Sequence, residues 1–121
     1  MKTLLVVDDE AGITEALNDL LSEEGFHVLV ASHGKEALAR LAEKRPDLIL
    51  LDYMMPVMDG RELLLALQGD AAHRDIPVLM MSAVPRSSLP LDCQPLAFLR
   101  KPFAIDRLLA EVNRLLGGGR P

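Results

Sequence analysis

The sequence has few of the residues that mark several large classes of protein. Tryptophan is absent, and the aromatic residues are three phenylalanines and one tyrosine, so the core has to consist of aliphatic side chains. The single cysteine, Cys93, cannot form an internal disulfide, which is typical of the reducing cytoplasm. No apolar run approaches the ~20 residues of a membrane span. The net charge of −5 argues against direct binding of nucleic acid, which needs a basic face.

The length of 121 residues, half of them hydrophobic, is that of one ordinary domain. We expect this domain to cover residues 1–117 and a flexible glycine-rich tail to cover 118–121. The tail is either the natural end or the start of a linker. The opening MKTLLVVDDE has too short an apolar stretch for a signal peptide and runs into acids, so it predicts a first strand.

Short apolar runs alternate with segments of helical period. Continuous apolar runs with β-branched residues predict strands buried on both faces, and apolar residues spaced three and four apart predict helices. The predicted strands are 4–7, 27–31, 48–51, 78–81 and 96–100, and the predicted helices lie at about 12–25, 34–44, 60–68 and 105–116. This alternation predicts an α/β fold with a parallel sheet and helices on both faces.

One segment breaks the alternation. Residues 84–95 read VPRSSLPLDCQP, with prolines at 85, 90 and 95. Each proline removes a backbone donor and opposes a helix interior. We therefore expect the fourth helix of the alternation to be short, irregular or absent.

Charged residues directly follow three of the predicted strands: Asp8 and Asp9, then Asp52, then Lys101. The carboxyl ends of parallel strands share one edge of the sheet, where ligands bind in open α/β folds. Carboxylates and an ammonium that meet there suit a divalent cation and a phosphoryl group. Taken alone, the first two acids are better explained as caps of the next helix, and the lysine is explained by an ordinary solvated side chain. The presence of Asp52 at a neighbouring strand end favours the metal site.

Asp52 offers the most specific chemistry. A carboxylate on a rigid strand end can attack phosphorus to form an aspartyl phosphate. Capping is a weak explanation, because residues 53–56 do not begin a helix. Ser82, at the end of the fourth strand, is either a phosphoryl ligand or a plain strand-end serine. A cis Lys101–Pro102 bond would fix the direction of the lysine side chain.

Four motifs occur in a fixed order: VVDDE at 6–10, LLDYMMPVMDG at 50–60, MSA at 81–83 and KPF at 101–103. Together they resemble the receiver domain of two-component response regulators, over residues 3 to about 116. The resemblance implies a flavodoxin-like, doubly wound sheet of five parallel strands in the order 2-1-3-4-5. It also implies a donor of phosphoryl groups, either a histidine kinase or a phosphotransfer protein.

The resemblance implies a role for each site residue. Asp52 becomes the phosphoacceptor and a ligand of Mg²⁺, Asp9 a direct metal ligand, and Asp8 a ligand mainly through water. The backbone carbonyl of Met54 becomes a further metal ligand.

The phosphoryl ligands follow in the same way. Ser82 and Lys101 become ligands of the phosphoryl group, and the Lys101–Pro102 bond is expected to be cis. Phe98 matches the switch aromatic, which turns inward as the hydroxyl residue moves toward the phosphoryl group.

The sequence also departs from the family. The interval from Ser82 to Lys101 is shorter than usual, which predicts an altered output surface or weak switching. Met54 and Val84 flank the approach of the hydrolytic water in the family, and neither side chain can orient water. We therefore expect slow loss of the phosphoryl group.

The favoured interpretation is a phosphorylation-switched signalling domain in the cytoplasm that acts through protein contacts and modifies only itself. It would neither bind nucleic acid directly nor insert into a membrane; its downstream target stays open. A phosphorylation-independent docking module with the same fold is an alternative. A phosphohydrolase with an aspartyl nucleophile is a third. It is disfavoured because Met54 stands where such enzymes usually place a second acid.

Overall fold

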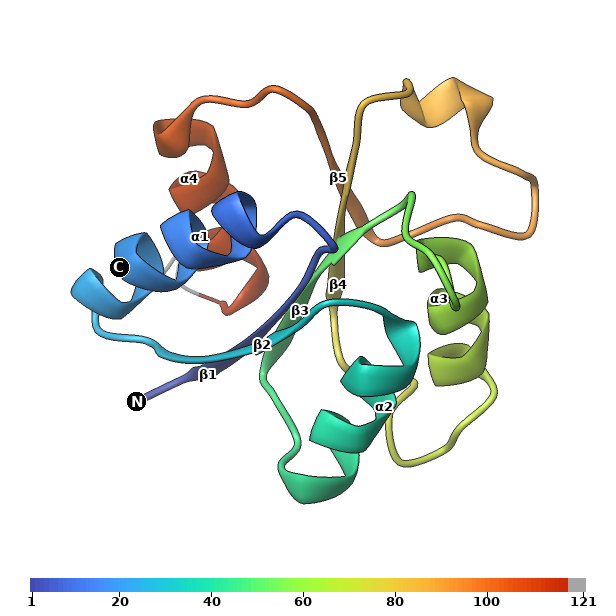
Figure 1. Cartoon of the computed structure of the whole chain (residues 1–121), viewed down its shortest axis with the longest axis horizontal. Coiled ribbons are helices and arrows are strands. Elements are labelled where there is room, and N and C mark those ends of the chain that lie inside the picture. Colours follow the sequence, from blue (N-terminus) through green and yellow to red (C-terminus); the bar gives the residue numbers. More distant parts are fainter. Residues whose placement is uncertain (118–121) are drawn as a thin grey trace.

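The computed structural model describes residues 1–117; the predicted tail at 118–121 lies outside the described residues. Strands and helices alternate as expected (Figure 1). The elements are β1 (Thr3–Val7), α1 (Ala11–Glu23), β2 (His27–Ala31), α2 (Gly34–Glu43), β3 (Leu48–Asp52), α3 (Gly60–Gln68), β4 (Val78–Ser82), β5 (Ala97–Arg100) and α4 (Ile105–Leu115). Among residues 1–117, no helix is long and apolar enough to span a bilayer.

The five strands form one parallel sheet in the order β2-β1-β3-β4-β5. This confirms the predicted doubly wound, flavodoxin-like arrangement. Val7 is paired with Leu51, so Asp8, which directly follows β1, and Asp52, the last residue of β3, lie at the same level. The register thereby brings the two acids to one edge of the sheet.

Two aliphatic cores cover the two faces of the sheet. One lies under α2 and α3, the other under α1 and α4 (Figure 1). In β1, Leu5 and Val7 point into the first core and Leu4 and Val6 into the second. Every residue of β1, β3 and β4 is buried, which explains why these strands read as continuous apolar runs rather than alternating ones.

Between β4 and β5, the described chain has a 3₁₀ turn at Arg86–Ser88 in place of a regular α-helix. The expectation of a short or absent fourth helix is thus confirmed. Leu89 and Cys93 are buried in the core under α3, with the Cys93 sulfur 4.0 Å from the sulfur of Met80. Two side chains of an irregular segment therefore cover the part of β4 that a helix would otherwise cover.

Two arginines hold this segment in place. Arg61, in α3, forms a bidentate ion pair with Asp92. Arg86 donates a hydrogen bond to the carbonyl oxygen of Pro95 over 2.6 Å. The segment between β4 and β5 is therefore tied both to the neighbouring helix and to itself.

Val57 is in a strained backbone conformation. Its φ is 69°, a region that β-branched residues rarely adopt, and its side chain is exposed. We expect Val57→Asn to raise the free energy of unfolding by about 1 kcal/mol, because asparagine tolerates this region better. Urea unfolding measures the change. Val57→Thr keeps the β-branch while removing apolar surface, so an equal gain from threonine would contradict strain as the cause.

Candidate functional site

Three carboxylates gather where β1 and β3 end. Asp8 and Asp52 are 1% and 5% exposed, whereas Asp9 is exposed. One carboxylate oxygen from each of the three lies within 4.8 Å of the others. A close set of acidic oxygens is the ligand type that Mg²⁺ prefers, so the donor set fits a hard divalent cation.

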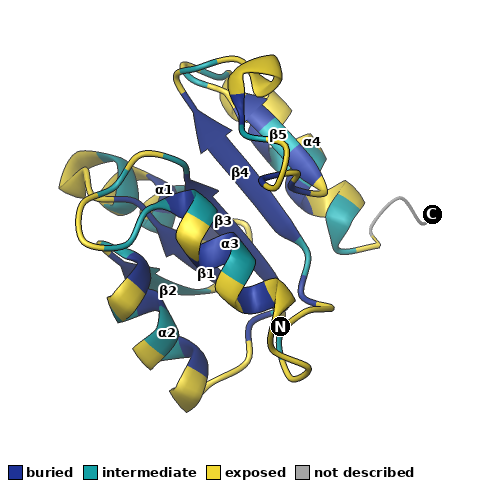
Figure 2. Ribbon diagram, turned by 90° about the vertical axis from the view of Figure 1, so that its right-hand side faces the viewer, coloured by how far each residue is buried: buried dark blue, intermediate teal, exposed yellow. Residues whose placement is uncertain are grey.

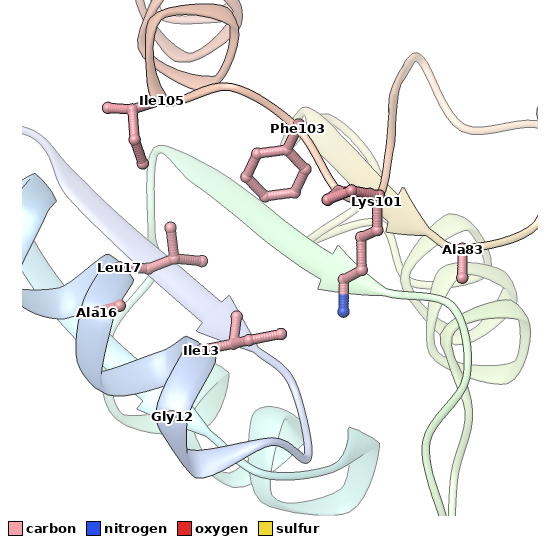
Figure 3. Close-up of a pocket in the computed structure, with 9 residues that line it drawn as sticks. Gly12, Ile13, Ala16, Leu17, Ala83, Lys101, Phe103 and Ile105 are labelled. Atoms are coloured by element: carbon pink, nitrogen blue, oxygen red, sulfur yellow. The ribbon is translucent and has the colours of Figure 1, made fainter.

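Lys101 brings a positive charge to these acids. Its ammonium nitrogen lies 2.9 Å from Oδ2 of Asp8, 3.1 Å from Oδ1 of Asp52 and 3.8 Å from Oε1 of Glu10. Figure 3 shows its side chain projecting toward the carboxyl ends of β1 and β3. The Lys101–Pro102 peptide bond is cis. The lysine thus links the two buried carboxylates across two strand ends.

The two oxygens of Asp8 already have protein partners. Oδ1 accepts a hydrogen bond from the backbone N–H of Glu10 over 2.9 Å, and Oδ2 accepts from Lys101. The exposed carboxylate of Asp9 stands beside this fixed pair. Direct metal coordination is therefore easier for Asp9 than for Asp8.

The electrostatics of the site favour a neutralising ligand. Burial raises the pKa of the Asp52 carboxyl from 3.8 to about 6, and the negative charge of Asp8 acts in the same direction, against the opposing effect of Lys101. Burial lowers the pKa of Lys101, but its hydrogen bond to Asp8 and the charge of Asp52 outweigh this and leave its pKa raised. The acids thus carry an excess of negative charge that a bound cation would relieve.

The loop after Asp52 ends at the first turn of α3, which packs back against the end of β3. Asp59 caps α3: its side chain accepts a hydrogen bond from the backbone N–H of Glu62, and the side chain of Glu62 accepts one from the backbone N–H of Asp59. The N–H of Gly60 donates to the carbonyl oxygen of Tyr53 over 2.9 Å. A Cβ at Gly60 would lie 2.5 Å from the carbonyl oxygen of Asp52. Only glycine allows this close approach, which fixes the backbone of Asp52.

Ser82 and Phe98 lie on the neighbouring strands. Ser82 is 1% exposed, and its Oγ accepts a hydrogen bond from the backbone N–H of Val84 over 3.0 Å. Phe98, level with Met80 across the sheet, is half-buried against the core under α3. The three acids and Lys101 therefore lie together, whereas the hydroxyl of Ser82 is hydrogen-bonded to the loop that follows it.

Two cavities adjoin Lys101. A cavity of about 270 Å³ lies over Asp52 and is also lined by Asp9, Glu10 and Met54. An apolar cavity of about 470 Å³ lies between α1 and the start of α4 (Figure 3). Its walls include Ile13, Ala16, Leu17, Phe103 and Ile105. The polar site thus opens beside an apolar surface.

Sequence reasoning missed Glu10 and the close approach at Gly60. Glu10 is the third acid of the DDE run and contributes the oxygen 3.8 Å from Lys101, so its adjacency to the acidic pair was the available signal. For Gly60, the position after a helix cap was visible, but the contact with Asp52 depends on how the loop returns to the strand.

Comparison with known proteins places these motifs in a family. Residues 4–113 match the model of the response regulator receiver domain. The chain is 40% identical to the response regulator MprA of Mycobacterium tuberculosis; the match covers 98% of this chain and 52% of MprA. The chain thus spans about half the length of these relatives.

Solved structures agree with this match. The signal receiver domain of a signal transduction histidine kinase from Syntrophus aciditrophicus superposes with a TM-score of 0.88 at 34% identity, covering 99% of this chain and 93% of that one. The response regulator TrrA of Thermotoga maritima, solved in complex with Mg(2+)-BeF, has a TM-score of 0.85 at 32% identity, covering 95% and 99%.

Proposed function

The chain belongs to the response regulator receiver family, and on this premise we propose that it accepts a phosphoryl group on Asp52 in a Mg²⁺-dependent reaction. A histidine kinase or a phosphotransfer protein is the proposed donor. The observation that carries this proposal is the convergence of Asp52 with two further acids and Lys101 at one edge of the sheet.

In the proposed reaction, a carboxylate oxygen of Asp52 attacks the phosphorus of a phosphohistidine on the donor. The new O–P bond forms as the P–N bond breaks, and the imidazole leaves and takes up a proton. Asp52, Asp9 and the backbone carbonyl of Met54 would hold Mg²⁺ directly, with Asp8 mainly through water. When bound, the ion neutralises charge on the phosphoryl oxygens and brings the two anions together.

Lys101 and Ser82 would then bind the phosphoryl group. The ammonium of Lys101 lies 3.1 Å from Oδ1 of Asp52. It would exchange this ion pair for one with a phosphoryl oxygen. Ser82 would turn its hydroxyl from its own loop toward the phosphoryl group, and Phe98 would turn inward behind it. Such a change is a two-state element biased by a local charge event.

The apolar surface beside Lys101 supports delivery by a protein donor. A protein that brings phosphohistidine to Asp52 has to cover this neighbourhood, and the cavity walls at Ile13, Phe103 and Ile105 offer apolar surface to bury. Burial of such surface drives most protein association.

Incubation with acetyl phosphate, with and without Mg²⁺, tests the proposal by intact mass. We expect one added phosphoryl group per chain when Mg²⁺ is present, and none when the metal is removed with a chelator. An unmodified wild type in the presence of Mg²⁺ would overturn the proposal and favour the docking module instead. That alternative draws support from the irregular segment between β4 and β5.

The phosphorylated protein is expected to lose its phosphoryl group slowly, with a half-life of minutes or longer. Met54 is exposed over the site, and its thioether cannot orient a water for attack. We expect Met54→Asn to shorten the half-life by several-fold, since ~1.4 kcal/mol of barrier changes the rate tenfold. A half-life of seconds for the wild type, measured by mass in Mg²⁺ buffer, would contradict this. Leu91→Asn, in the distant segment, serves as control.

A further inference from the structure

The methionines of this chain differ sharply in how far water reaches their sulfur atoms. Met80 and Met81 lie in β4, which is buried along its whole length (Figure 2). Met55 and Met58 are half-buried against the core under α3. Met54, by contrast, is 65% exposed. An oxidant dissolved in water therefore reaches Met54 before the other four, because oxidation of a thioether requires access to its sulfur.

The side chain of Met54 lies over the acidic site. It lines the cavity of about 270 Å³ together with Asp52, Asp9 and Lys101. One water takes up about 30 Å³ of the liquid, so this cavity has room for a phosphoryl group on Asp52 and for waters beside it. A thioether is only a weak hydrogen-bond acceptor. The polarity of this one side chain therefore decides how well a water in the cavity is held.

We propose that Met54 is a site of reversible oxidation by peroxides, and that its sulfoxide shortens the lifetime of a phosphoryl group on Asp52. In the oxidation step, the O–O bond of hydrogen peroxide breaks, one oxygen bonds to sulfur, and water leaves. The sulfur loses the two electrons that the peroxide gains. The step converts an apolar side chain into a polar one. The effect on lifetime rests on the proposed function, whereas the oxidation itself does not.

The sulfoxide acts on hydrolysis by orienting water. Its oxygen accepts a hydrogen bond from a water in the cavity, and this water adds to phosphorus as the P–O bond to Asp52 breaks. Inorganic phosphate leaves with the hydrogens of the water, and the carboxylate is restored. The sulfoxide takes no proton; it raises the rate by positioning the nucleophile. An oxidant thereby shortens the signal without altering the acceptor.

Peptide mapping after brief exposure to hydrogen peroxide tests the oxidation step. Met1 is the internal reference, since it is 92% exposed and lies at the amino end of β1, opposite the acidic site. We expect Met54 to be oxidised within about threefold of the rate of Met1, and at least about tenfold faster than Met80 or Met81. A Met54 oxidised as slowly as the buried pair would overturn the proposal.

The effect on lifetime is tested on protein oxidised at Met54, freed of peroxide with catalase and phosphorylated with acetyl phosphate in Mg²⁺. Intact mass then follows the loss of the phosphoryl group. We expect the half-life to fall at least about threefold relative to untreated protein, and methionine sulfoxide reductases to restore it. Met54→Leu keeps an apolar side chain and the backbone carbonyl but forms no sulfoxide, so peroxide should leave its own half-life unchanged.

Two results of this second test would overturn the proposal. One is a half-life that oxidation of Met54 leaves unchanged or lengthens. The other is a half-life that peroxide also shortens in Met54→Leu, because this variant retains Met55 and Met58 and the effect would then belong to them. Failure of the untreated wild type to take up a phosphoryl group is a distinct result: it overturns the proposed function, and the effect on lifetime with it.

Discussion

Asp52→Asn is expected to abolish the incorporation of phosphoryl groups from acetyl phosphate in Mg²⁺. The amide nitrogen and oxygen are far weaker nucleophiles than a carboxylate, and the variant also removes one of the three acidic oxygens that lie within 4.8 Å of one another. Intact mass measures the outcome directly. A phosphoryl group retained by the variant would mean that another residue is the acceptor.

A matched control is available in the same loop. Asp59 caps α3, and asparagine caps helices as well as aspartate does. Asp59→Asn removes one negative charge near the site without removing a proposed ligand. We expect this variant to accept one phosphoryl group as the wild type does, which separates loss of the acceptor from loss of charge.

The same Asp52 substitution should stabilise the metal-free protein at neutral pH. The pKa of Asp52 is raised from 3.8 to about 6 in the fold, so the folded chain holds the proton more tightly than the unfolded chain. The stability that this proton contributes is complete below about pH 3.8 and is lost as the pH rises through about 6. Asparagine carries no such loss. The variant should therefore gain on the order of 1–3 kcal/mol at pH 7.

Urea unfolding at pH 4.5, 6 and 7.5 in chelator measures this difference. The difference in the free energy of unfolding between Asp52→Asn and the wild type should increase from pH 4.5 to pH 7.5. Mg²⁺ should reduce this difference at pH 7.5, because it stabilises the wild type. An advantage that is constant with pH would show that the carboxyl is not destabilised in the fold.

The fold could be predicted closely because its signals are local. The period of apolar residues located each helix and strand to within about two residues, since every strand of the inner sheet is buried on both faces and reads as one apolar run. The convergence of Asp8, Asp52 and Lys101 also followed from local signals, because parallel strands end at a common edge. Three prolines sufficed to predict the missing helix.

What replaced the helix could not be predicted. The ion pair between Arg61 and Asp92 joins residues 31 apart in the sequence, and the packing of Cys93 on Met80 depends on the path of an irregular segment. No periodicity encodes such contacts.

Gly60→Ala is expected to lower the free energy of unfolding by on the order of 2–4 kcal/mol. The added Cβ would lie 2.5 Å from the carbonyl oxygen of Asp52 and 2.7 Å from the Cα of Tyr53. Both are backbone atoms held by the sheet and by the bond from the N–H of Gly60 to Tyr53, so neither can move aside cheaply. The shift has to be taken up by the loop that carries Asp52, and Mg²⁺ affinity should fall with stability.

Alanine substitutions at two other glycines, Gly12 and Gly34, allow the effect of Gly60→Ala on stability to be compared with milder cases. Gly12, in α1, has nothing within 4 Å of an added Cβ, so Gly12→Ala should stabilise by up to about 1 kcal/mol through helix propensity. At Gly34 the added Cβ would lie 2.5 Å from the Cγ and 2.8 Å from the Cβ of Met58. Rotation of the methionine moves its Cγ away, but its Cβ can move only with the loop that carries it. Gly34→Ala should therefore be destabilising, though less so than Gly60→Ala, which meets backbone atoms at the end of a buried strand. The order of the three variants in urea unfolding, rather than any single value, distinguishes backbone contact from a general intolerance of alanine. A Gly60→Ala protein as stable as Gly34→Ala would contradict the close approach at Asp52.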